Sequence, residues 1–281
     1  MKRIFLALGL LLALTAPADA ARKPKAPAKL PPVAWRDADA ENTLVVDTNQ
    51  GRIIAELYPQ VAPQSVARIK QLARQHFYDG LTFFRVINGF MAQTGDPQNT
   101  GQGTSVLPSL PAEFSFKMPA NGGMTVVDHS AGQDQGFIGE MPIVSQPAAL
   151  GALTIDGRIS AHPTFCAGVL GMARADDPNS ANSQFFFMRD TRPNLDGKYT
   201  AFGRVISGQD VVRQIKAGEP VPAPQDVMQR VQVLADIPEG VRPSVKVADT
   251  RSAYFAAVIA KLKAEGYGLD MCDVQFAVDA K

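Results

Sequence analysis

The sequence of 281 residues predicts a mainly β fold with two helices in its central part, on the basis of three observations. Short runs rich in Val, Ile, Phe and Thr recur along that part and are bounded by Gly, Asn and Asp, which is typical of strands and turns. Two segments, 63–74 and 209–216, instead space their apolar residues as a helix does. Many short strands and two helices suit a closed antiparallel barrel with helical lids, although the spacing alone does not distinguish a barrel from a sandwich.

The first twenty residues are predicted to be a cleaved secretory signal. Two basic residues precede an apolar run, 4–14, that is too short to span a bilayer comfortably, and Ala18-Asp19-Ala20 offers a cleavage site after Ala20. The alternative is an uncleaved membrane anchor. A cleaved signal predicts an exported protein, periplasmic or secreted. Residues 21–42, rich in Pro and Lys, are predicted to be an extended, solvated linker.

The charge of the mature chain gives no sign of a highly charged partner. Removing Lys2 and Arg3 from 28 basic residues and Asp19 from 27 acidic ones leaves 26 of each, a net charge of zero. No strong field for nucleic acid or anionic lipid is expected from such a balance. After signal cleavage no remaining segment is apolar for long enough to cross a membrane, and a monomer is expected.

The central elements follow from local patterns. Leu44 to Leu57 is predicted to form a β-hairpin, because both arms are β-branched and Asn49-Gln50-Gly51 supplies the turn. Pro63 is expected to begin a helix that runs to about Arg74, and a second helix is expected from Gln209 to Lys216. Further strands are predicted near 82–87, 90–94, 169–173, 184–188, 201–205 and 228–234.

An insertion of about 117–163 interrupts this pattern. It is rich in Gly, Pro, Asp, Gln and Met, and is predicted to be a long loop that is functional or mobile. Within it we expect Ile138 and Ile143-Val144 to pack locally, and Leu150 to Ile155 to add a short hairpin.

A C-terminal extension, 236–281, is predicted to hold one amphipathic helix from Ser252 to Ala264, with Asp249-Thr250 as its N-cap and Gly266 as its stop. Its apolar face, which includes Phe255 and Ile259, is expected to dock on the barrel rather than form a separate domain.

Cys166 and Cys272 are the only cysteines. In an oxidising compartment they could form a disulfide that ties the extension to the core. Alternatively, Cys166 is a small buried residue and Cys272 an incidental thiol. Both interpretations remain open at this point.

Four motifs carry the functional prediction. Residues 83–96 read FFRVINGFMAQTGD and place one guanidinium, that of Arg85, among aromatic and thioether side chains. A second run of this mixture, SQFFF, occupies 183–187, and the others are GMARA at 171–175 and LDGKY at 195–199, which AFGRV at 201–205 follows. An always-charged group beside an apolar pocket suits chemistry on an apolar, uncharged substrate such as a proline ring.

In this order the four motifs resemble those of the cyclophilin family of peptidyl-prolyl cis-trans isomerases. The resemblance covers roughly Thr43 to Val233, and 43–235 is predicted to be the isomerase domain. It implies a closed eight-stranded antiparallel barrel with a helix over each open end, a solid core and an active site on the outer face. The implied substrates are Xaa–Pro bonds in unfolded or extended polypeptides, and the reaction needs neither a cofactor nor a metal.

The resemblance also implies the site residues. Arg85 would be the catalytic donor to the prolyl nitrogen, and Gln93 would orient it or hold the substrate carbonyl. The proline slot would consist of Phe90, Met91, Phe186 and Leu195, and the rest of the substrate would contact Gln184, Tyr199 and the strand of Ala173, Arg174 and Ala175. Phe83, Phe185 and Phe187 alternate with site residues along their strands and are therefore expected to point into the core.

Three positions depart from the best-known members of the family. Arg174 stands where those members carry asparagine, and Asn194 and Tyr199 stand where they carry tryptophan and histidine. We therefore expect a working pocket that binds the family's cyclic-peptide inhibitor weakly. The alternatives to a folding enzyme are a chaperone or scaffold that grips proline segments with little turnover, and an accessory protein whose insertion or final helix engages an envelope partner.

Overall fold

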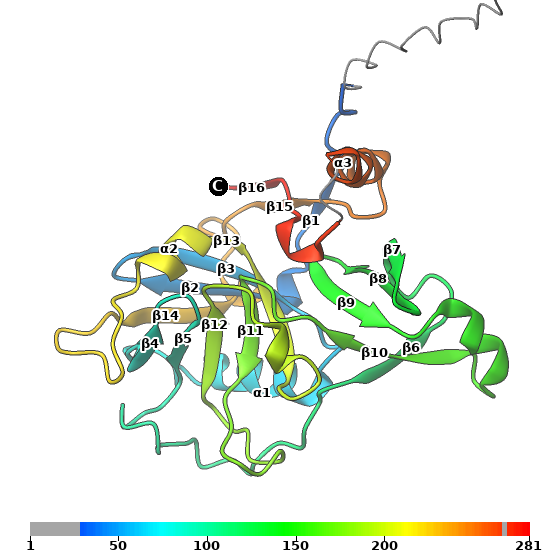
Figure 1. The fold of residues 1–281 in the computed structure, drawn as a ribbon. Helices are drawn as coiled ribbons and strands as arrows, with labels where there is room; N and C mark the ends of the chain where they lie inside the picture. Colours follow the sequence, from blue (N-terminus) through cyan, green and yellow to red (C-terminus); the bar gives the residue numbers. More distant parts are fainter. Residues whose placement is uncertain (1–28, 266–268) are drawn as a thin grey trace, which may run out of the picture.

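The computed structural model describes residues 29–265 and 269–281, so the predicted signal peptide and the start of the predicted linker lie outside the described residues. Its largest element is an eight-stranded antiparallel sheet that curls around the main core (Figure 1). In spatial order its strands are β14 (Met228–Val233), β2 (Thr43–Thr48), β3 (Gly51–Leu57), β13 (Ala201–Ser207), β11 (Val169–Met172), β12 (Phe185–Met188), β5 (Met91–Thr94) and β4 (Arg85–Ile87).

The predicted hairpin is present as β2 and β3. Thr48 pairs with Gly51 across a turn of two residues, and the Thr48 hydroxyl donates to the Gly51 carbonyl at 2.8 Å. Gly51 has φ +134°, a conformation that an L side chain rarely adopts. This turn sets a register in which Leu44, Val46, Ile53 and Ala55 all face the core.

Hydrogen bonding does not close the sheet into a barrel. Its two edge strands, β14 and β4, do not pair with each other. An isolated antiparallel bridge links Thr82, which precedes β4, to Val227, which precedes β14. The structure therefore confirms a mainly β fold with a curled eight-stranded sheet, while full closure stays a prediction.

Two helices cover opposite ends of this sheet (Figure 1). Helix α1 (Pro63–Arg74) agrees with the prediction, and its Val66, Ile69 and Leu72 lie in the main core. Helix α2 (Gln209–Gln214) ends two residues earlier than predicted, because Ile215 adopts an extended conformation and is buried in the same core.

The insertion is a second sheet, so the prediction of a long loop is wrong. Its five antiparallel strands are, in spatial order, β6 (Phe116–Pro119), β10 (Arg158–Pro163), β9 (Met141–Ser145), β8 (Gln133–Ile138) and β7 (Thr125–Ser130). Ile143 is fully buried and Ile138 packs beside it, as predicted. The predicted hairpin at 150–155 is also wrong, because 148–153 is a 3-10 helix that opens after Pro147 and packs the buried Gly151 against Ala120.

A third sheet joins segments from both ends of the described chain. Its strands, in spatial order, are β1 (Trp35–Asp37), β15 (Val245–Ala248) and β16 (Val278–Ala280). The prediction of a solvated linker is therefore wrong for its last residues, because β1 pairs with β15 and a 3-10 helix follows it. The 3-10 helices of the structure are Ala40–Asn42, Ala148–Leu153, Pro193–Leu195, Leu234–Asp236 and Met271–Asp273.

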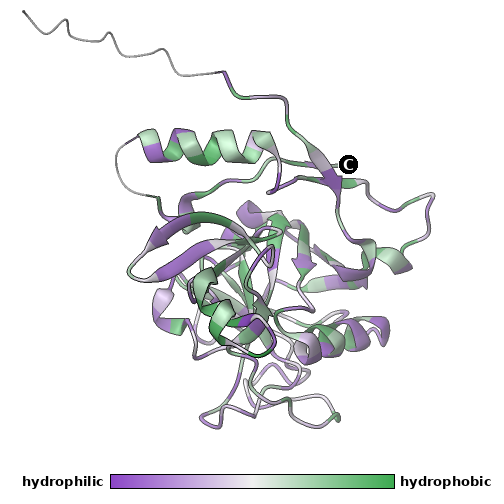
Figure 2. Cartoon of the chain, turned by 90° about the vertical axis from the view of Figure 1, so that its right-hand side faces the viewer, coloured by the Kyte–Doolittle hydropathy of each residue, from purple (hydrophilic) through white to green (hydrophobic). Residues whose placement is uncertain are grey.

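Helix α3 (Ala253–Ala264) docks on the inserted sheet and not on the eight-stranded sheet, which corrects the prediction. Its buried Phe255 meets Phe137 of β8 edge to face, with ring centroids 5.7 Å apart, and it stacks on Phe276 at 5.6 Å. Figure 2 shows α3 lying at the edge of the molecule, away from the eight-stranded sheet. Its N-cap is Ser252, whose hydroxyl accepts from the Phe255 N–H, and not Asp249-Thr250. The predicted stop at Gly266 lies outside the described residues.

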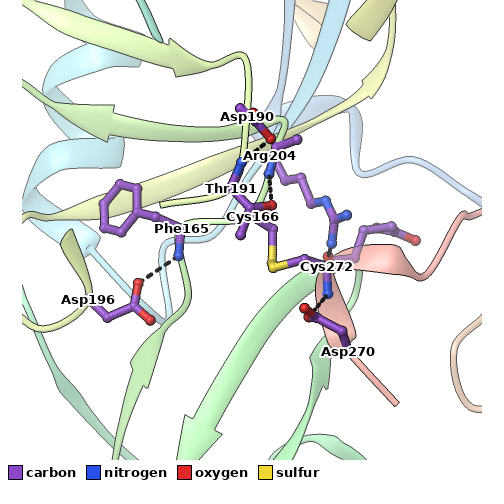
Figure 3. The surroundings of a disulfide bond; sticks show 10 residues. Phe165, Cys166, Asp190, Thr191, Asp196, Arg204, Asp270 and Cys272 are labelled. Carbon is purple, nitrogen blue, oxygen red and sulfur yellow. Dashed lines mark hydrogen bonds between the residues drawn. A yellow bond between two sulfur atoms is a disulfide. The ribbon is translucent and has the colours of Figure 1, made fainter. Parts of the chain in front are cut away.

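A disulfide joins Cys166 to Cys272, with the two Cα atoms 5.0 Å apart (Figure 3). Cys166 lies just before β11, and Cys272 lies in the last 3-10 helix. Of the two interpretations of the cysteines, the structure therefore supports the bridge between extension and core. Among residues 29–265 and 269–281, the helices lack the combination of length and apolarity that a bilayer crossing requires.

Candidate active site

A row of side chains crosses the outer face of the eight-stranded sheet. Arg85 of β4 is the cross-strand partner of Gln93 of β5, Gln93 is the partner of Phe186 of β12, and Phe186 is the partner of Gly171 of β11. Directly paired residues in adjacent strands share one face of a sheet. The neighbouring residues Phe83, Phe185 and Phe187 face the other way and are fully buried in the core, as predicted.

Arg85 is held from both sides by acceptors. Its Nη1 donates to Gln93 Oε1 at 3.2 Å, and its Nε donates to Glu219 Oε1 at 2.6 Å. The Arg85 side chain remains 37% exposed, so the guanidinium lies at the surface of the sheet rather than inside it.

A chain of amide hydrogen bonds continues from Gln93 into the next loop. Gln93 Nε2 donates to Gln184 Oε1 at 2.8 Å, and Gln184 Nε2 donates to the carbonyls of Gly103 at 2.8 Å and Gly101 at 3.1 Å. Both glutamine amides thus have their orientation fixed by partners. The two predicted polar residues form one connected network with Arg85.

The loop that receives this network is organised by Asp96, which is fully buried. Its carboxylate accepts from the N–H groups of Gln98 at 2.7 Å, Thr100 at 2.9 Å and Gly101 at 2.6 Å. Burial by itself would raise the pKa of the Asp96 carboxyl, but these backbone donors together with that of Gly103 lower it below its ordinary value. Asp96 is therefore an ionised anchor for the loop at the rim of the site.

A cavity of about 300 Å³ lies beside Arg85, and most of the residues in its wall are aromatic or aliphatic. Met91, Phe186 and Leu195 in its wall are almost fully buried. The Phe186 ring packs on Phe165, with centroids 6.0 Å apart, and meets Tyr199 edge to face at 6.2 Å. The complete lining consists of Phe84, Arg85, Phe90, Met91, Gln93, Gly101, Ala173, Arg174, Phe186, Leu195 and Tyr199.

A second cavity of about 300 Å³ adjoins the first and shares Gln93, Gly101, Ala173 and Arg174 with it. Its other lining residues are Gln102, Thr104, Ala175, Ser180, Asn182 and Gln184. Each residue predicted for the site lines one cavity or the other. The structure thus brings together the whole predicted set from four separate motifs.

Arg174 lies between the two cavities. Its guanidinium carbon is 4.5 Å from the centroid of the Tyr199 ring, and its Nη1 donates to the Ala175 carbonyl at 2.7 Å. Such stacking of a guanidinium on an aromatic ring is favourable. Arg174 and Tyr199, two of the three departures noted in the sequence, therefore contact each other, while Asn194 is exposed.

Several residues of the site were not named as site residues by the sequence. Phe84 lies just before β4, and both it and Arg85 line the cavity, so the strict alternation of a strand, which would place Arg85 on the same face as Phe83, does not reveal it. Gly101 belongs to the glycine-rich run 101–104, which the resemblance places near the active site without giving it a role, and whose position depends on Asp96. Glu219 carries no signal in the sequence, since it reaches Arg85 from a segment far along the chain.

Comparison with known proteins agrees with this geometry. A family model for "Cyclophilin type peptidyl-prolyl cis-trans isomerase" matches residues 43–234. A probable peptidyl-prolyl cis-trans isomerase of Brucella suis is 38% identical over 192 residues, which cover 64% of this chain and 74% of that protein. Peptidyl-prolyl cis-trans isomerase B of Bacillus subtilis is 32% identical over 182 residues, covering 65% of this chain and 90% of the relative.

One solved structure is similar over most of the chain. The crystal structure of a cyclophilin from Hirschia baltica is 33% identical in sequence, covers 88% of this chain and 93% of its own, and superimposes with a TM-score of 0.80. This coverage is wider than the residues that the family model matches, so the similarity extends beyond the isomerase domain.

Proposed function

Because the chain belongs to the cyclophilin family of peptidyl-prolyl cis-trans isomerases, we propose that Arg85 is the group with which it lowers the barrier to rotation about Xaa–Pro bonds. The chain is a peptidyl-prolyl cis-trans isomerase, and its substrates are peptides that contain such bonds.

The chemistry requires a donor and an apolar slot. Delocalisation of the nitrogen lone pair makes the planar amide resist rotation, with a barrier of about 18–20 kcal/mol. When the bond twists, the lone pair returns to the prolyl nitrogen and becomes a good hydrogen-bond acceptor. A donor aimed at this nitrogen therefore binds the twisted amide more tightly than either planar isomer, which is what catalysis needs.

One observation carries the assignment to Arg85. Its guanidinium lies at the edge of the apolar cavity, and two acceptors, Gln93 and Glu219, occupy its Nη1 and Nε. Within residues 29–265 and 269–281, the Nη2 donors and one hydrogen of Nη1 have no acceptor and are left for a substrate. An oriented donor of this kind needs little reorganisation when the amide twists.

The remaining residues then take complementary roles. The proline ring would occupy the cavity between Phe90, Met91, Phe186 and Leu195, since aromatic faces and a thioether suit a small saturated ring. The residues before proline would run past the second cavity, where Gln184, Tyr199 and the main chain of 173–175 would contact them.

The test is a protease-coupled assay on an Ala-Pro peptide. Arg85→Ala should lower kcat/KM by about a hundredfold, as loss of a positioned donor does in other enzymes. Arg85→Lys should recover only part of the rate, because lysine lacks the planar fork. The matched control is Arg52→Ala, which also removes a half-exposed arginine whose Nε donates to a carboxylate, that of Asp47, at 2.6 Å. Equal rates for the wild type and Arg85→Ala would remove Arg85 from the chemistry and would favour binding of proline segments by the pocket alone.

We further propose that the enzyme works outside the cytoplasm as a monomer that assists folding of exported proteins. The signal-like segment before Ala21 supports export, and the bond between Cys166 and Cys272 is of the kind that persists in oxidising compartments. Recovery of a chain that starts at Ala21 from a periplasmic extract, monomeric by light scattering, is the expected result. A full-length chain found only in the cytoplasm would contradict it.

A further inference from the structure

The strand that carries Arg85 has a second neighbour besides β5. Val86 and Gly218 exchange both backbone hydrogen bonds, each 2.8 Å long, in an antiparallel bridge. In such a bridge the residue before one member lies opposite the residue after the other. Arg85 and Glu219 are therefore cross-strand partners, and their side chains emerge on the same face, where Arg85 Nε donates to Glu219 Oε1 at 2.6 Å.

The segment that presents Glu219 is itself fixed in place. Val221 is buried in the main core, and its N–H donates to the Phe84 carbonyl at 2.9 Å. Lys216 closes the loop from the other side, because its Nζ donates to the carbonyls of Pro222 at 2.8 Å and Pro224 at 3.2 Å. Glu219 therefore lies on a loop whose conformation is held by hydrogen bonds and by the burial of Val221.

Arg85 by itself has many accessible orientations, since a long side chain that is 37% exposed loses little rotamer freedom on folding. Gln93 contacts the guanidinium at Nη1 and Glu219 contacts it at Nε, so the two acceptors together fix the plane of the group. With either acceptor alone, the guanidinium could still turn about a single hydrogen bond.

We propose that Glu219 is a positioning residue for the isomerase reaction: it sets the orientation of Arg85 and so the direction in which the Nη2 donors point. This inference rests on the proposed role of Arg85. Glu219 does not touch the substrate, and because its side chain is 57% exposed, solvent screens its attraction for Arg85. Its effect on the rate is accordingly modest.

The experiment compares Glu219→Ala and Glu219→Gln with the wild type in the peptide assay. The alanine variant should lose about twofold to fivefold in kcat/KM, the range that corresponds to an exposed ion pair. The loss should lie in kcat and not in KM, because the apolar slot is intact. Glu219→Gln retains an acceptor oxygen and should recover most of the rate. Glu239→Ala, at another exposed glutamate, is the matched control and should leave the rate unchanged.

A double-mutant cycle distinguishes positioning from an independent effect. In an Arg85→Ala background, Glu219→Ala should have no further effect, because a residue that acts through Arg85 cannot act without it. Added salt should also shrink the difference between the wild type and Glu219→Ala.

Three results would overturn the inference: a Glu219→Ala rate equal to or above that of the wild type, a loss confined to KM, or an undiminished effect in the absence of Arg85. If the catalytic role proposed for Arg85 is itself wrong, the result is different, because Arg85→Ala would then keep the wild-type rate.

Discussion

At the scale of single residues, the shape of the proline slot depends on a residue without a side chain. Gly171 lies opposite Phe186 in the β11–β12 ladder, and the rings of Phe186 and Phe165 fill the space above its Cα atom. A Cβ atom at this position would overlap both rings. Glycine is therefore required here by close approach of the aromatic wall and not by backbone conformation.

Gly171→Ala should push the Phe186 ring into the slot. We expect kcat/KM to fall by about tenfold or more, mainly through KM, with a loss of about 1–3 kcal/mol in the free energy of unfolding, because over-packing strains a filled site. Peptide kinetics and thermal melting measure the two effects. Gly240→Ala is the control, since a Cβ atom there meets open space. Wild-type kinetics for Gly171→Ala would show that the Phe186 wall is not part of the slot.

Most residues of the site could be predicted from the sequence motifs, but one could not. Arg85, Gln93, Gln184 and Phe186 were all identifiable, because each lies inside a run whose composition is unusual for a strand. Glu219 was not, because its role depends on the bridge between Val86 and Gly218, and residues far apart in sequence give no local sign that they pair.

At the scale of elements, the extension and the insertion form one unit. Helix α3 packs on Val127, Phe137 and Val144 of the inserted sheet, together with Met271 and Val274 from the segment that follows the helix. The apolar face of α3 was predictable from its spacing, but its partner was not, because the insertion was itself expected to be a loop.

The inserted strands escaped prediction for a compositional reason. Strand β8 contains Gln133, Asp134, Gln135 and Gly136, none of which favours strands. Gly136 is nevertheless needed, because a Cβ atom there would meet the backbone of Thr125 in the neighbouring strand. Asp134 is buried because its carboxylate accepts from the Ala148 N–H at 2.9 Å and contacts His129 Nδ1 at 2.7 Å. Tertiary pairing thus overrides weak local preference.

Phe255→Ala should release α3 from the inserted sheet while the isomerase site keeps its structure. The side chain is 2% exposed, and loss of a buried Phe costs about 3–5 kcal/mol. Hydrogen exchange should therefore accelerate in 253–264 and in β7 and β8, with peptide isomerisation nearly unchanged. Lys261→Ala on the exposed side of the helix serves as the control. Loss of isomerase activity in Phe255→Ala at a temperature where the eight-stranded sheet stays protected would show instead that the active site depends on this packing.

At the scale of the whole molecule, the three sheets meet at one buried charge cluster. Arg36 of the third sheet donates to Glu56 of the eight-stranded sheet, through Nη1 at 2.7 Å and Nη2 at 2.6 Å, and it also contacts Glu140 of the inserted segment. The Tyr58 hydroxyl donates to Glu140 Oε2 at 3.2 Å, and Arg204 Nη1 donates to the Glu140 carbonyl at 2.5 Å. The carboxyl groups of Glu56 and Glu140 both contact the guanidinium of Arg36.

Their proximity drives their pKa values apart. Burial, followed by the negative charge of Glu56, raises the pKa of Glu140 to about 8. The pKa of Glu56 is shifted downward: burial opposes this shift, and hydrogen bonds from Arg36 lead the effects that produce it. At neutral pH the pair therefore holds one proton, on Glu140.

The proton on Glu140 predicts how stability depends on pH. Between the ordinary carboxyl pKa of 4.5 and about 8, the native state binds a proton that the unfolded chain has released. The contribution of Glu140 to stability is therefore complete below about pH 4.5 and is lost as the pH rises through 8. Glu140→Gln cannot ionise, so its stability relative to the wild type should be greater at pH 8.5 than at pH 5 by several kcal/mol, because each unit of the shift from 4.5 to about 8 corresponds to about 1.4 kcal/mol.

Urea unfolding at the two pH values measures this difference, with the exposed Glu239→Gln as control. A wild type whose stability relative to Glu140→Gln is the same at pH 5 and pH 8.5 would show that Glu140 titrates normally in the folded protein.

The cluster also limits how freely the parts of this molecule could be exchanged with those of compact relatives. In a host without a strand that carries Arg36, the transplanted insertion would bury the Glu140 carboxyl without its guanidinium partner. An unpaired buried acid is strongly destabilising. The insertion, strand β1 and Glu56 must therefore be transferred together, although they lie far apart along the chain.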